Sequence, residues 1–238
     1  QVRALLEGFA GRAFAENGSR VAFVDIQDRP AGGLCEELSG SIHRPLFIRC
    51  DVTDTEALKA AIGRTRDELG LIGVLVNNAA NDQRHEIDAV DPDYWDRSFA
   101  INLKPHFFAA QAARPQMREL GGGAIINFSS TSWRFGAAAM PAYATAKAAV
   151  LGLTSALARG FGDDNIRVNA IEPGAVMTER QRQLWYTTQE SVDAIISRQV
   201  IKRVLLGEHI ARMVLFLAAD DSAMITKQSI IVDAGISG

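Results

Sequence analysis

The sequence predicts an α/β fold: one doubly wound domain whose parallel sheet is covered by helices on both faces. Short apolar runs such as Val21–Val24 and Val74–Val76 alternate with longer stretches that have helical spacing of apolar residues. These runs are apolar throughout, which is typical of strands buried on both faces of a parallel sheet. Because no internal repeat or low-complexity linker divides the 238 residues, we expect a single domain over residues 1–238.

The elements are expected in a regular order. Strands are predicted near residues 21–25, 45–50, 74–76, 123–128, 166–171 and 229–232, and helices near residues 54–69, 93–120, 146–153 and 208–219. Thr53 or Asp54 is expected to cap the first of these helices, and Pro105 and Pro115 are expected to interrupt the second. The polar and aromatic segment at about residues 178–200 is expected to form a lid over the substrate.

Composition excludes several classes of partner. The chain is 47% hydrophobic and 22% charged, as globular proteins are, and its net charge of −3 without a basic cluster argues against nucleic acid. No apolar run approaches the length of a membrane span and no secretory signal opens the chain, so we expect a cytoplasmic protein without a membrane partner. The two cysteines, Cys35 and Cys50, favour a reducing compartment over a disulfide framework.

Polar residues, glycine or proline follow the predicted strands. They are Asp25, Asp51, Asn77, Asn78, Ser129, Ser130, Glu172, Pro173 and Gly174. Such residues normally end strands, so each alone is weak evidence. Because the carboxyl ends of parallel strands share one edge of the sheet, where ligands bind, their joint occurrence favours one cleft.

Tyr143 and Lys147 lie four residues apart in a predicted helix and therefore project from the same face. An ammonium near a phenol favours the phenolate and lowers the pKa of the phenol. A phenol tuned in this way could take a proton from an alcohol near neutral pH. A surface Tyr–Lys pair would have the same spacing, so these two residues alone do not decide the function.

The chain resembles the short-chain dehydrogenase/reductase family in motifs that follow the order and spacing of that family. The motifs are Asp51-Val52, Asn77-Asn78-Ala79, Asn102, Ser130, Tyr143 with Lys147, and Pro173-Gly174 through Thr178. The match covers nearly the whole chain from about residue 12. The resemblance implies a Rossmann-type fold, a nicotinamide cofactor and a Ser-Tyr-Lys-Asn catalytic group.

The resemblance also implies a role for each of four catalytic residues. Tyr143 is expected to be the general base, and Ser130 is expected to orient the substrate hydroxyl. Lys147 is expected to hold the nicotinamide ribose and to lower the pKa of Tyr143. Asn102 is expected to keep a kink in its helix and to hold a water that relays protons to Lys147.

Asp25 follows the strand that ends beside the adenosine ribose. A carboxylate there accepts hydrogen bonds from the ribose hydroxyls and repels a 2′-phosphate, so we expect NAD rather than NADP. The other cofactor-binding residues that the resemblance implies are Ile26, Asp51, Val52, Asn78, Ala79, Ala80, Tyr143, Lys147, Pro173, Gly174, Val176 and Thr178.

The Gly-rich phosphate loop departs from the family pattern. The family has Thr-Gly-x-x-x-Gly-x-Gly, whereas residues 7–11 read Glu-Gly-Phe-Ala-Gly after a possible strand remnant at residues 2–6. Those glycines let the backbone approach a pyrophosphate above a helix N-terminus. We expect residues of this loop to be missing from the sequence, and the alternative is a degenerate loop that impairs cofactor binding. Milder departures are Ala80 in place of Gly, and Ala234 where Val-Asp-Gly-Gly is usual.

Several segments resemble bacterial aldose 1-dehydrogenases of the D-xylose type within this family. They are residues 81–85, 93–96, 126–128, 132–133 and 178–187. The resemblance implies transfer of a hydride from C1 of a pentose or hexose pyranose to NAD, which gives a lactone. Polar groups could bind the sugar hydroxyls and indole rings could cover the pyranose, although packing or a solvated loop would explain them too. The candidate substrate residues are Asn81, Arg84, Ser132, Trp133 and Trp185.

Two other functions stay open. One is a short-chain dehydrogenase for another secondary alcohol, such as a 3-hydroxyacyl or steroid-like substrate, although the polar residues 81–84 argue weakly against an apolar one. The other is a cofactor-poor binding protein of the same fold. The four histidines at positions 43, 85, 106 and 209 lack ligand-like spacing, so we expect no metal. The family resemblance implies a homotetramer built through the two long helices and the C-terminal region.

Overall fold

The computed structural model describes residues 3–6 and 9–237. Within them, all strands belong to one parallel sheet of order β3-β2-β1-β4-β5-β6-β7. The strands are β1 (Arg3–Leu6), β2 (Arg20–Asp25), β3 (Leu46–Arg49), β4 (Val74–Asn77), β5 (Gly123–Phe128), β6 (Ile166–Pro173) and β7 (Ser229–Val232). The helices are α1 (Phe9–Glu16), α2 (Asp28–Glu37), α3 (Thr55–Leu69), α4 (Pro92–Asn102), α5 (Lys104–Glu119), α6 (Pro141–Phe161), α7 (Glu179–Leu184), α8 (Gln189–Arg198) and α9 (Gly207–Ala218).

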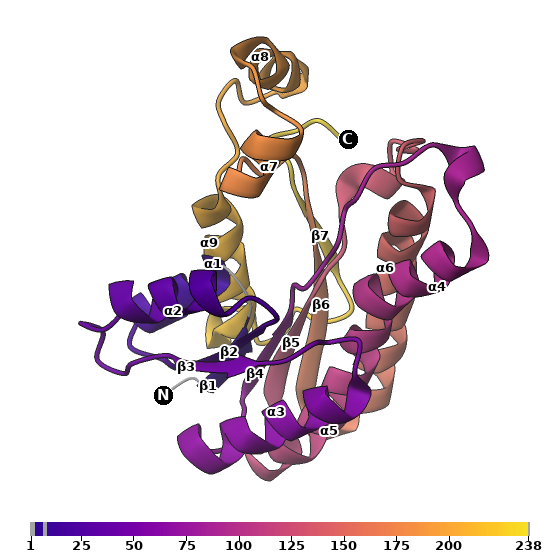
Figure 1. Cartoon of the computed structure of the whole chain (residues 1–238). Coiled ribbons are helices and arrows are strands. Elements are labelled where there is room, and N and C mark those ends of the chain that lie inside the picture. The colour runs from indigo at the N-terminus through magenta and orange to yellow at the C-terminus, as the bar shows by residue number, and fades with distance from the viewer. Residues whose placement is uncertain (1–2, 7–8, 238) are drawn as a thin grey trace.

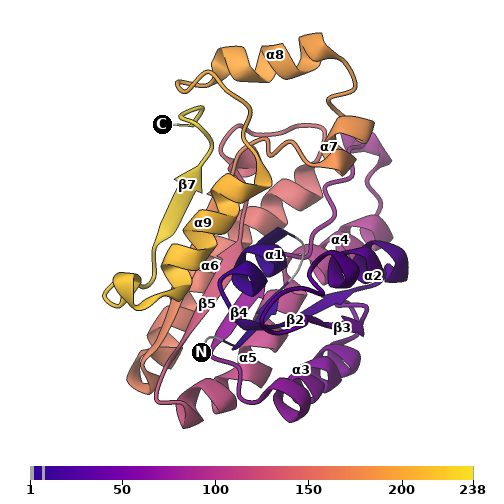
Figure 2. The same cartoon turned by 90° about the vertical axis from the view of Figure 1, so that its left-hand side faces the viewer.

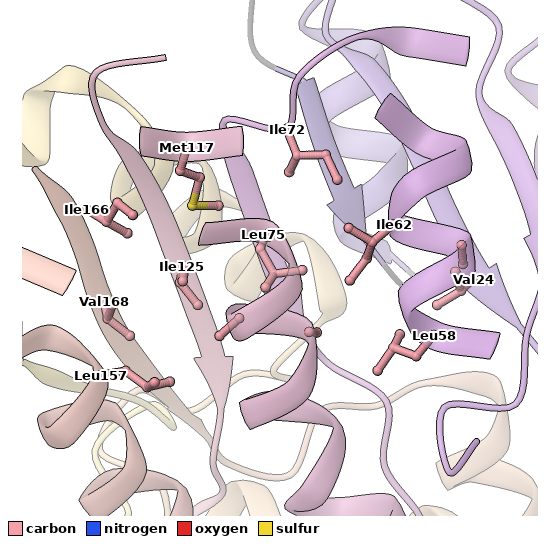
Figure 3. Packing of buried hydrophobic residues seen from close by; sticks show 14 of the residues in the cluster. Val24, Leu58, Ile62, Ile72, Leu75, Met117, Ile125, Leu157, Ile166 and Val168 are labelled. Carbon is pink, nitrogen blue, oxygen red and sulfur yellow. The ribbon is translucent and has the colours of Figure 1, made fainter. Parts of the chain in front are cut away.

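Helices cover both faces of the sheet, with α1, α2 and α9 on one side and α3, α5 and α6 on the other (Figures 1 and 2). Successive side chains of a strand point to opposite faces, so neighbouring residues of β5 enter different cores. Ile125 packs with Leu75 and Met117 under α3 and α5, as Figure 3 shows. Ile126 packs with Phe14 of α1 in the other core. The predicted doubly wound α/β fold is confirmed.

The order of the strands places a ligand crevice. The chain runs outward from β1 to β3 and then crosses to β4 on the other side of β1. In sheets of this kind ligands bind outside the carboxyl ends of the strands, at the point where the strand order reverses. That point lies here between β1 and β4. Among the described residues, no helix is both long and apolar enough to cross a bilayer.

The long predicted helix that contains both prolines is two helices in the structure. α4 ends at Asn102, Leu103 leaves the helical region with φ −133°, and Pro105 lies in the first turn of α5. Proline has no backbone N–H, and in the first turn of a helix this group has no partner within the helix, so proline is tolerated there. The expected interruption at Pro115 is wrong, because α5 continues through it. Pro115 and Gln111, whose carbonyl loses its helical partner, are both exposed, so water can replace that hydrogen bond.

Helical spacing did not predict α1 and α2. α2 contains Pro30, Gly32 and Gly33, which disfavour a helix. It forms because Cys35 packs against Phe23 of the sheet, a tertiary contact that outweighs the local preference. The possible strand before α1 is confirmed as β1.

We expect Ile125→Ala to lower the free energy of unfolding by about 2–5 kcal/mol, because the lost methyl groups leave a cavity. Ile125 is fully buried in β5, an interior strand of the sheet. Urea denaturation measures the change. The control is Ile42→Ala, at a residue that is 79% exposed, with an expected change within about 0.5 kcal/mol. Equal losses in the two variants would contradict the placement of Ile125 in the core.

Candidate active site

Three of the predicted catalytic residues meet at the carboxyl end of β5. The Nζ of Lys147, a residue only 1% exposed, donates to the carbonyl of Phe128 over 2.8 Å, and Ser129 Oγ donates to the Lys147 carbonyl over 2.7 Å. These bonds hold α6 against the end of the strand, next to Ser130. Tyr143 lies one turn earlier in α6, with its ring centroid 5.7 Å from Lys147 Nζ, and hydrogen-bonds with Ser130.

The phenol of Tyr143 does not titrate near neutral pH in this structure. Burial raises the pKa of Tyr143 to about 12, and the Asp82 carboxylate also raises it, whereas the hydrogen bond with Ser130 and the Arg180 guanidinium lower it. The net shift is therefore opposite to the lowering that was expected from Lys147. Removal of the phenolate from water outweighs the groups that favour it.

Asn102 is fully buried at the end of α4, directly before the break that separates α4 from α5. Its Oδ1 accepts from the backbone N–H of Asn81 over 2.9 Å, and its Nδ2 donates to the Asn81 carbonyl over 3.2 Å and to the Ser98 carbonyl over 3.0 Å. The amide therefore holds the backbone of the loop that follows β4. The expected kink lies at this position, and the water relay to Lys147 stays a prediction.

His106 lies in the first turn of α5, four residues after Asn102, and is 1% exposed. Burial, together with the positive charge of Lys147, holds the pKa of His106 well below its usual value. The imidazole is therefore neutral and adds no charge beside Lys147. The sequence analysis considered this histidine only as a metal ligand. Among the described residues, no group of three His, Cys, Asp or Glu side chains is placed to hold a metal ion.

The predicted cofactor residues lie in the turns after four strands. Asp25 ends β2, and its Oδ1 accepts from the Gln27 N–H over 2.8 Å. Asp51 follows β3, and its Oδ1 accepts from the N–H and hydroxyl of Thr53. Ile26 is exposed, whereas Val52 packs against the core. The others follow β4 or lead from β6 to α7: Asn78, Ala79, Ala80, Pro173, Gly174, Val176 and Thr178.

The turn after β6 requires glycine. A Cβ on Gly174 would lie 2.6 Å from the Cβ and 2.9 Å from the Cα of Asp233, so a larger residue would displace the backbone. Asp233 in turn accepts from the N–H groups of Gly235 and Ser237, which ties the C-terminal segment to this turn. Ala234 adopts φ 58°, a left-handed conformation that favours glycine, which accounts physically for the usual Gly at this position.

The polar groups along this edge of the sheet fit the two ends of a nicotinamide dinucleotide. Asp25 ends β2, where its carboxylate would be an acceptor for ribose hydroxyls, and Lys147 and the Pro173-Gly174 turn lie at the ends of β5 and β6. Between them, β1 ends at Leu6 and α1 begins at Phe9. Residues 7 and 8 of the predicted phosphate loop lie outside the described residues, and Gly11 lies within α1.

Glu172 organises the turn that follows Ser130. It is fully buried; its Oε2 accepts from Trp133 Nε1 and Arg134 Nε, each over 2.8 Å. Its Oε1 accepts from Arg134 Nη2 over 2.8 Å and from Ser229 Oγ over 2.5 Å. Burial alone would raise the pKa of Glu172, but the hydrogen bonds from Arg134, Ser229 and Trp133 outweigh it and lower the pKa. The four bonds tie this turn to β6 and β7.

Sequence reasoning noted Glu172 only as a polar strand end. The signal that could have found it is a carboxylate directly after the apolar residues Ala170 and Ile171 of a predicted strand, because such a group is rarely buried without several donors. The position of its donors, in a different loop and in the edge strand, could not be read from the spacing.

The predicted substrate residues lie in the segments that follow β4, β5 and β6, but not all are free to meet a ligand. The guanidinium of Arg134 lies 4.6 Å from the ring centroid of Trp133 and covers one face of that ring. Arg84 lies 4.2 Å from the ring centroid of Trp185, so these two predicted residues contact each other. The Oδ1 of Asn81 accepts from the N–H of Gln83 over 3.2 Å.

Two polar atoms of the substrate candidates are buried without a hydrogen-bond partner in the described part of the chain: Ser132 Oγ and Trp185 Nε1. Buried polar groups are normally paired, so both are positioned for a ligand or water. Sequence reasoning missed Arg180 and Gln181 of α7, which bind Asp82 of the loop after β4. Their charged and polar side chains gave no spacing signal, because the contact joins residues about a hundred positions apart.

The family model described as enoyl-(acyl carrier protein) reductase matches residues 9–237. The protein named "Probable galactose dehydrogenase GalD" of Rhizobium meliloti (strain 1021) is 46% identical over 225 residues, which cover 94% of this chain and 88% of that protein. The D-xylose 1-dehydrogenase of Caulobacter vibrioides (strain NA1000 / CB15N) is 43% identical over 222 residues, which cover 93% of this chain and 87% of that protein.

Solved structures share the fold. A crystal structure from Sinorhizobium meliloti 1021, provisionally described as a short-chain alcohol dehydrogenase, superimposes with a TM-score of 0.92 at 30% identity and covers 99% of this chain and 96% of that one. A short-chain type dehydrogenase/reductase from Mycobacterium ulcerans gives a TM-score of 0.91 over 100% of this chain and 90% of its own, at 24% identity. The second likeness shows the fold alone.

A doubly wound sheet with Ser130, Tyr143 and Lys147 at its carboxyl edge defines a Rossmann-type oxidoreductase. The chain belongs to the short-chain dehydrogenase/reductase family. The resemblance stated from the motifs is confirmed.

We expect Glu172→Gln to lower the free energy of unfolding by about 1–3 kcal/mol near neutral pH, because it leaves buried donors without a carboxylate. The lowered pKa of Glu172 means that its contribution is present above its ordinary pKa of 4.5 and is lost as pH falls through the folded value. The difference from the unchanged protein should therefore shrink below about pH 4.5 in denaturation curves measured across pH. The exposed Glu119→Gln is the control, and a difference that stays constant with pH would contradict this role.

Proposed function

We propose that this protein is an NAD-dependent aldose 1-dehydrogenase that oxidises C1 of a pentose or hexose pyranose to the lactone. The observation that carries the proposal is the convergence of Ser130, Tyr143 and Lys147 beside the polar loop that follows β4. The names of relatives that are 46% and 43% identical, a galactose and a D-xylose dehydrogenase, support an aldose as the substrate.

In the proposed reaction, Tyr143 accepts the proton of the anomeric hydroxyl while Ser130 orients that hydroxyl. Lys147 holds the ribose next to the reacting carbon, and its ammonium stabilises the phenolate when it forms. A bound nicotinamide cofactor would take the hydride from C1. Because the pKa of Tyr143 is raised to about 12, the phenol is mostly protonated at neutral pH, which favours the reductive direction there.

The proposed sugar site uses side chains from the segments that follow β4, β5 and β6. Asn81 and Ser132 would bind hydroxyls, and the unpartnered Ser132 Oγ supports this role. The free face of Trp133 and the ring of Trp185 would cover the pyranose. Arg84 would act by holding Trp185. Residues 178–200, which contain α7 and α8, would be the lid, and Figure 1 shows both helices beyond the carboxyl ends of the strands.

We also propose NAD as the cofactor, on the Asp25 carboxylate, and a homotetramer. Large apolar side chains on α4 and α5 that are more than a third exposed support association: Trp95 is 37% and Phe107 is 39% exposed. The cytoplasmic location stays a prediction.

A substrate screen tests the proposal directly. NADH formation is followed at fixed NAD with a series of aldoses, 3-hydroxyacyl thioesters and steroid alcohols. We expect turnover with at least one aldose and lactone as the product. Turnover of only the thioesters or steroids would overturn the sugar assignment, and no binding of NADH at millimolar concentration would favour the cofactor-poor alternative.

We expect Tyr143→Phe to abolish turnover and to leave the affinity for NADH within about threefold, because the phenol takes part in proton transfer. In the unchanged enzyme, the rate of oxidation should rise with pH between about 7 and 9, by up to about tenfold per unit, as the phenolate fraction grows. Steady-state rates and NADH fluorescence titrations measure both effects. Residual turnover in the variant, or a rate that does not change with pH, would show that another group is the base.

We expect Asp25→Ser to lower the preference for NAD over NADP by about tenfold or more, because the carboxylate that repels a 2′-phosphate is gone. The ratio of kcat/KM for the two cofactors measures this preference. Asp51→Asn is the control, because it changes a carboxylate in the turn after the neighbouring strand. A larger effect at Asp51 than at Asp25 would contradict the assignment.

A further inference from the structure

The loop after β4 and the helix α7 contact each other at two points, although they are far apart in the sequence. Asp82 forms an ion pair with Arg180, and its Oδ2 accepts from Gln181 Nε2 over 2.6 Å. Arg84 covers the ring of Trp185 at the other end of α7. These contacts dock the first half of the lid segment on the loop that Asn102 holds.

The first turn of α7, which carries Arg180 and Gln181, has an N-terminal cap. Thr178 Oγ1 accepts from the Gln181 N–H over 3.2 Å, which fixes the first turn of α7. Both oxygens of Asp82 therefore accept from α7, one from Arg180 and the other from Gln181. The side chain of Asp82 is 18% exposed, so its charge is largely removed from water and depends on Arg180 for compensation.

Both members of this pair lie within electrostatic reach of the reacting position. Asp82 raises the pKa of Tyr143 and Arg180 lowers it, so their charges act in opposite directions on the same phenol. Within this pair the two opposite charges compensate each other, and Arg180 has its charge satisfied by Asp82.

We propose that the Asp82–Arg180 pair makes the site selective for uncharged aldoses over sugar acids. The proposal rests on the proposed function and names its substrate class more closely. A substrate carboxylate that bound Arg180 would have to displace Asp82, which would leave two negative charges close together in a partly buried site. A neutral sugar needs no such exchange, because its hydroxyls donate to the remaining lone pairs of Asp82 while the ion pair persists.

The test compares an aldose with the uronic acid that differs from it only at C6, such as galactose and galacturonate. For each enzyme, kcat/KM is measured with both sugars, and the uronate is also titrated as a competitive inhibitor of aldose oxidation. In Asp82→Asn the side chain keeps its shape and Arg180 becomes available. We expect the ratio of kcat/KM for the aldose to kcat/KM for the uronate to fall about tenfold or more. If the uronate is not turned over, its inhibition constant relative to the KM of the aldose should fall by the same factor.

The matched control is Glu179→Gln, because it removes a negative charge from α7, the helix that carries Arg180, and leaves Asp82 unchanged. Glu179 is exposed and accepts only from Gln183 of its own helix among the bonds described. In Glu179→Gln, the aldose-to-uronate ratio of kcat/KM should equal that of the unchanged enzyme. If Asp82→Asn does not fold, Arg180→Gln decides: it leaves Asp82 uncompensated, so uronate inhibition should weaken about tenfold, and unchanged inhibition overturns the proposal.

The failures are distinguishable. Equal losses with both sugars in Asp82→Asn, at an unchanged ratio, overturn the charge selectivity and leave the aldose dehydrogenase assignment in place. Absence of turnover with every aldose in the unchanged enzyme overturns the proposed function itself, and this proposal with it.

Discussion

A line of buried hydrogen bonds between α6 and the centre of the sheet is the interaction on which the site depends. Asn127 of β5 accepts from Asn77 Nδ2 of β4 over 2.9 Å and donates to Thr154 Oγ1 of α6 over 3.0 Å. Lys147 Nζ continues the line to the Phe128 carbonyl. Buried amides and hydroxyls need partners, so these bonds permit one register of the helix on the strands. That register brings Tyr143 beside Ser130.

Charge around this line is balanced in pairs. Glu172 forms an ion pair with Arg134 in the turn that follows Ser130. Asp82 forms an ion pair with Arg180 of α7. Glu172 is fully buried and Asp82 is 18% exposed, and each accepts from more than one donor in distant segments of the chain, which is the condition under which such a charge is tolerated. Burial is the main cause of the raised pKa of Tyr143, and Asp82 and Arg180 act on the same phenol in opposite directions. The site is thus shaped by desolvation as much as by any single cation.

Prediction from the sequence succeeded where the signal is local and failed where a distant contact decides. The alternation of apolar runs and the spacing of Tyr143 and Lys147 predicted the fold and the catalytic face of α6. The predicted helix break at Pro115 was wrong, because this turn of α5 is exposed and water can hydrogen-bond to the carbonyl that a proline leaves unpaired. α2 was missed because its packing on the sheet outweighs its glycines and proline.

The pattern of residues was enough to predict the class of fold and the edge of the sheet where the candidate site lies, because periodicity and motif spacing are local properties. The catalytic roles of Ser130, Tyr143, Lys147 and Asn102 stay predictions. Only the tertiary structure decided what surrounds them. In the folded chain Glu172 accepts hydrogen bonds from the turn after Ser130, and Asp82 pairs with Arg180. Burial in the folded chain also raises the pKa of Tyr143. Burial and pairing across distant segments depend on the packed chain, and no spacing within the sequence contains them.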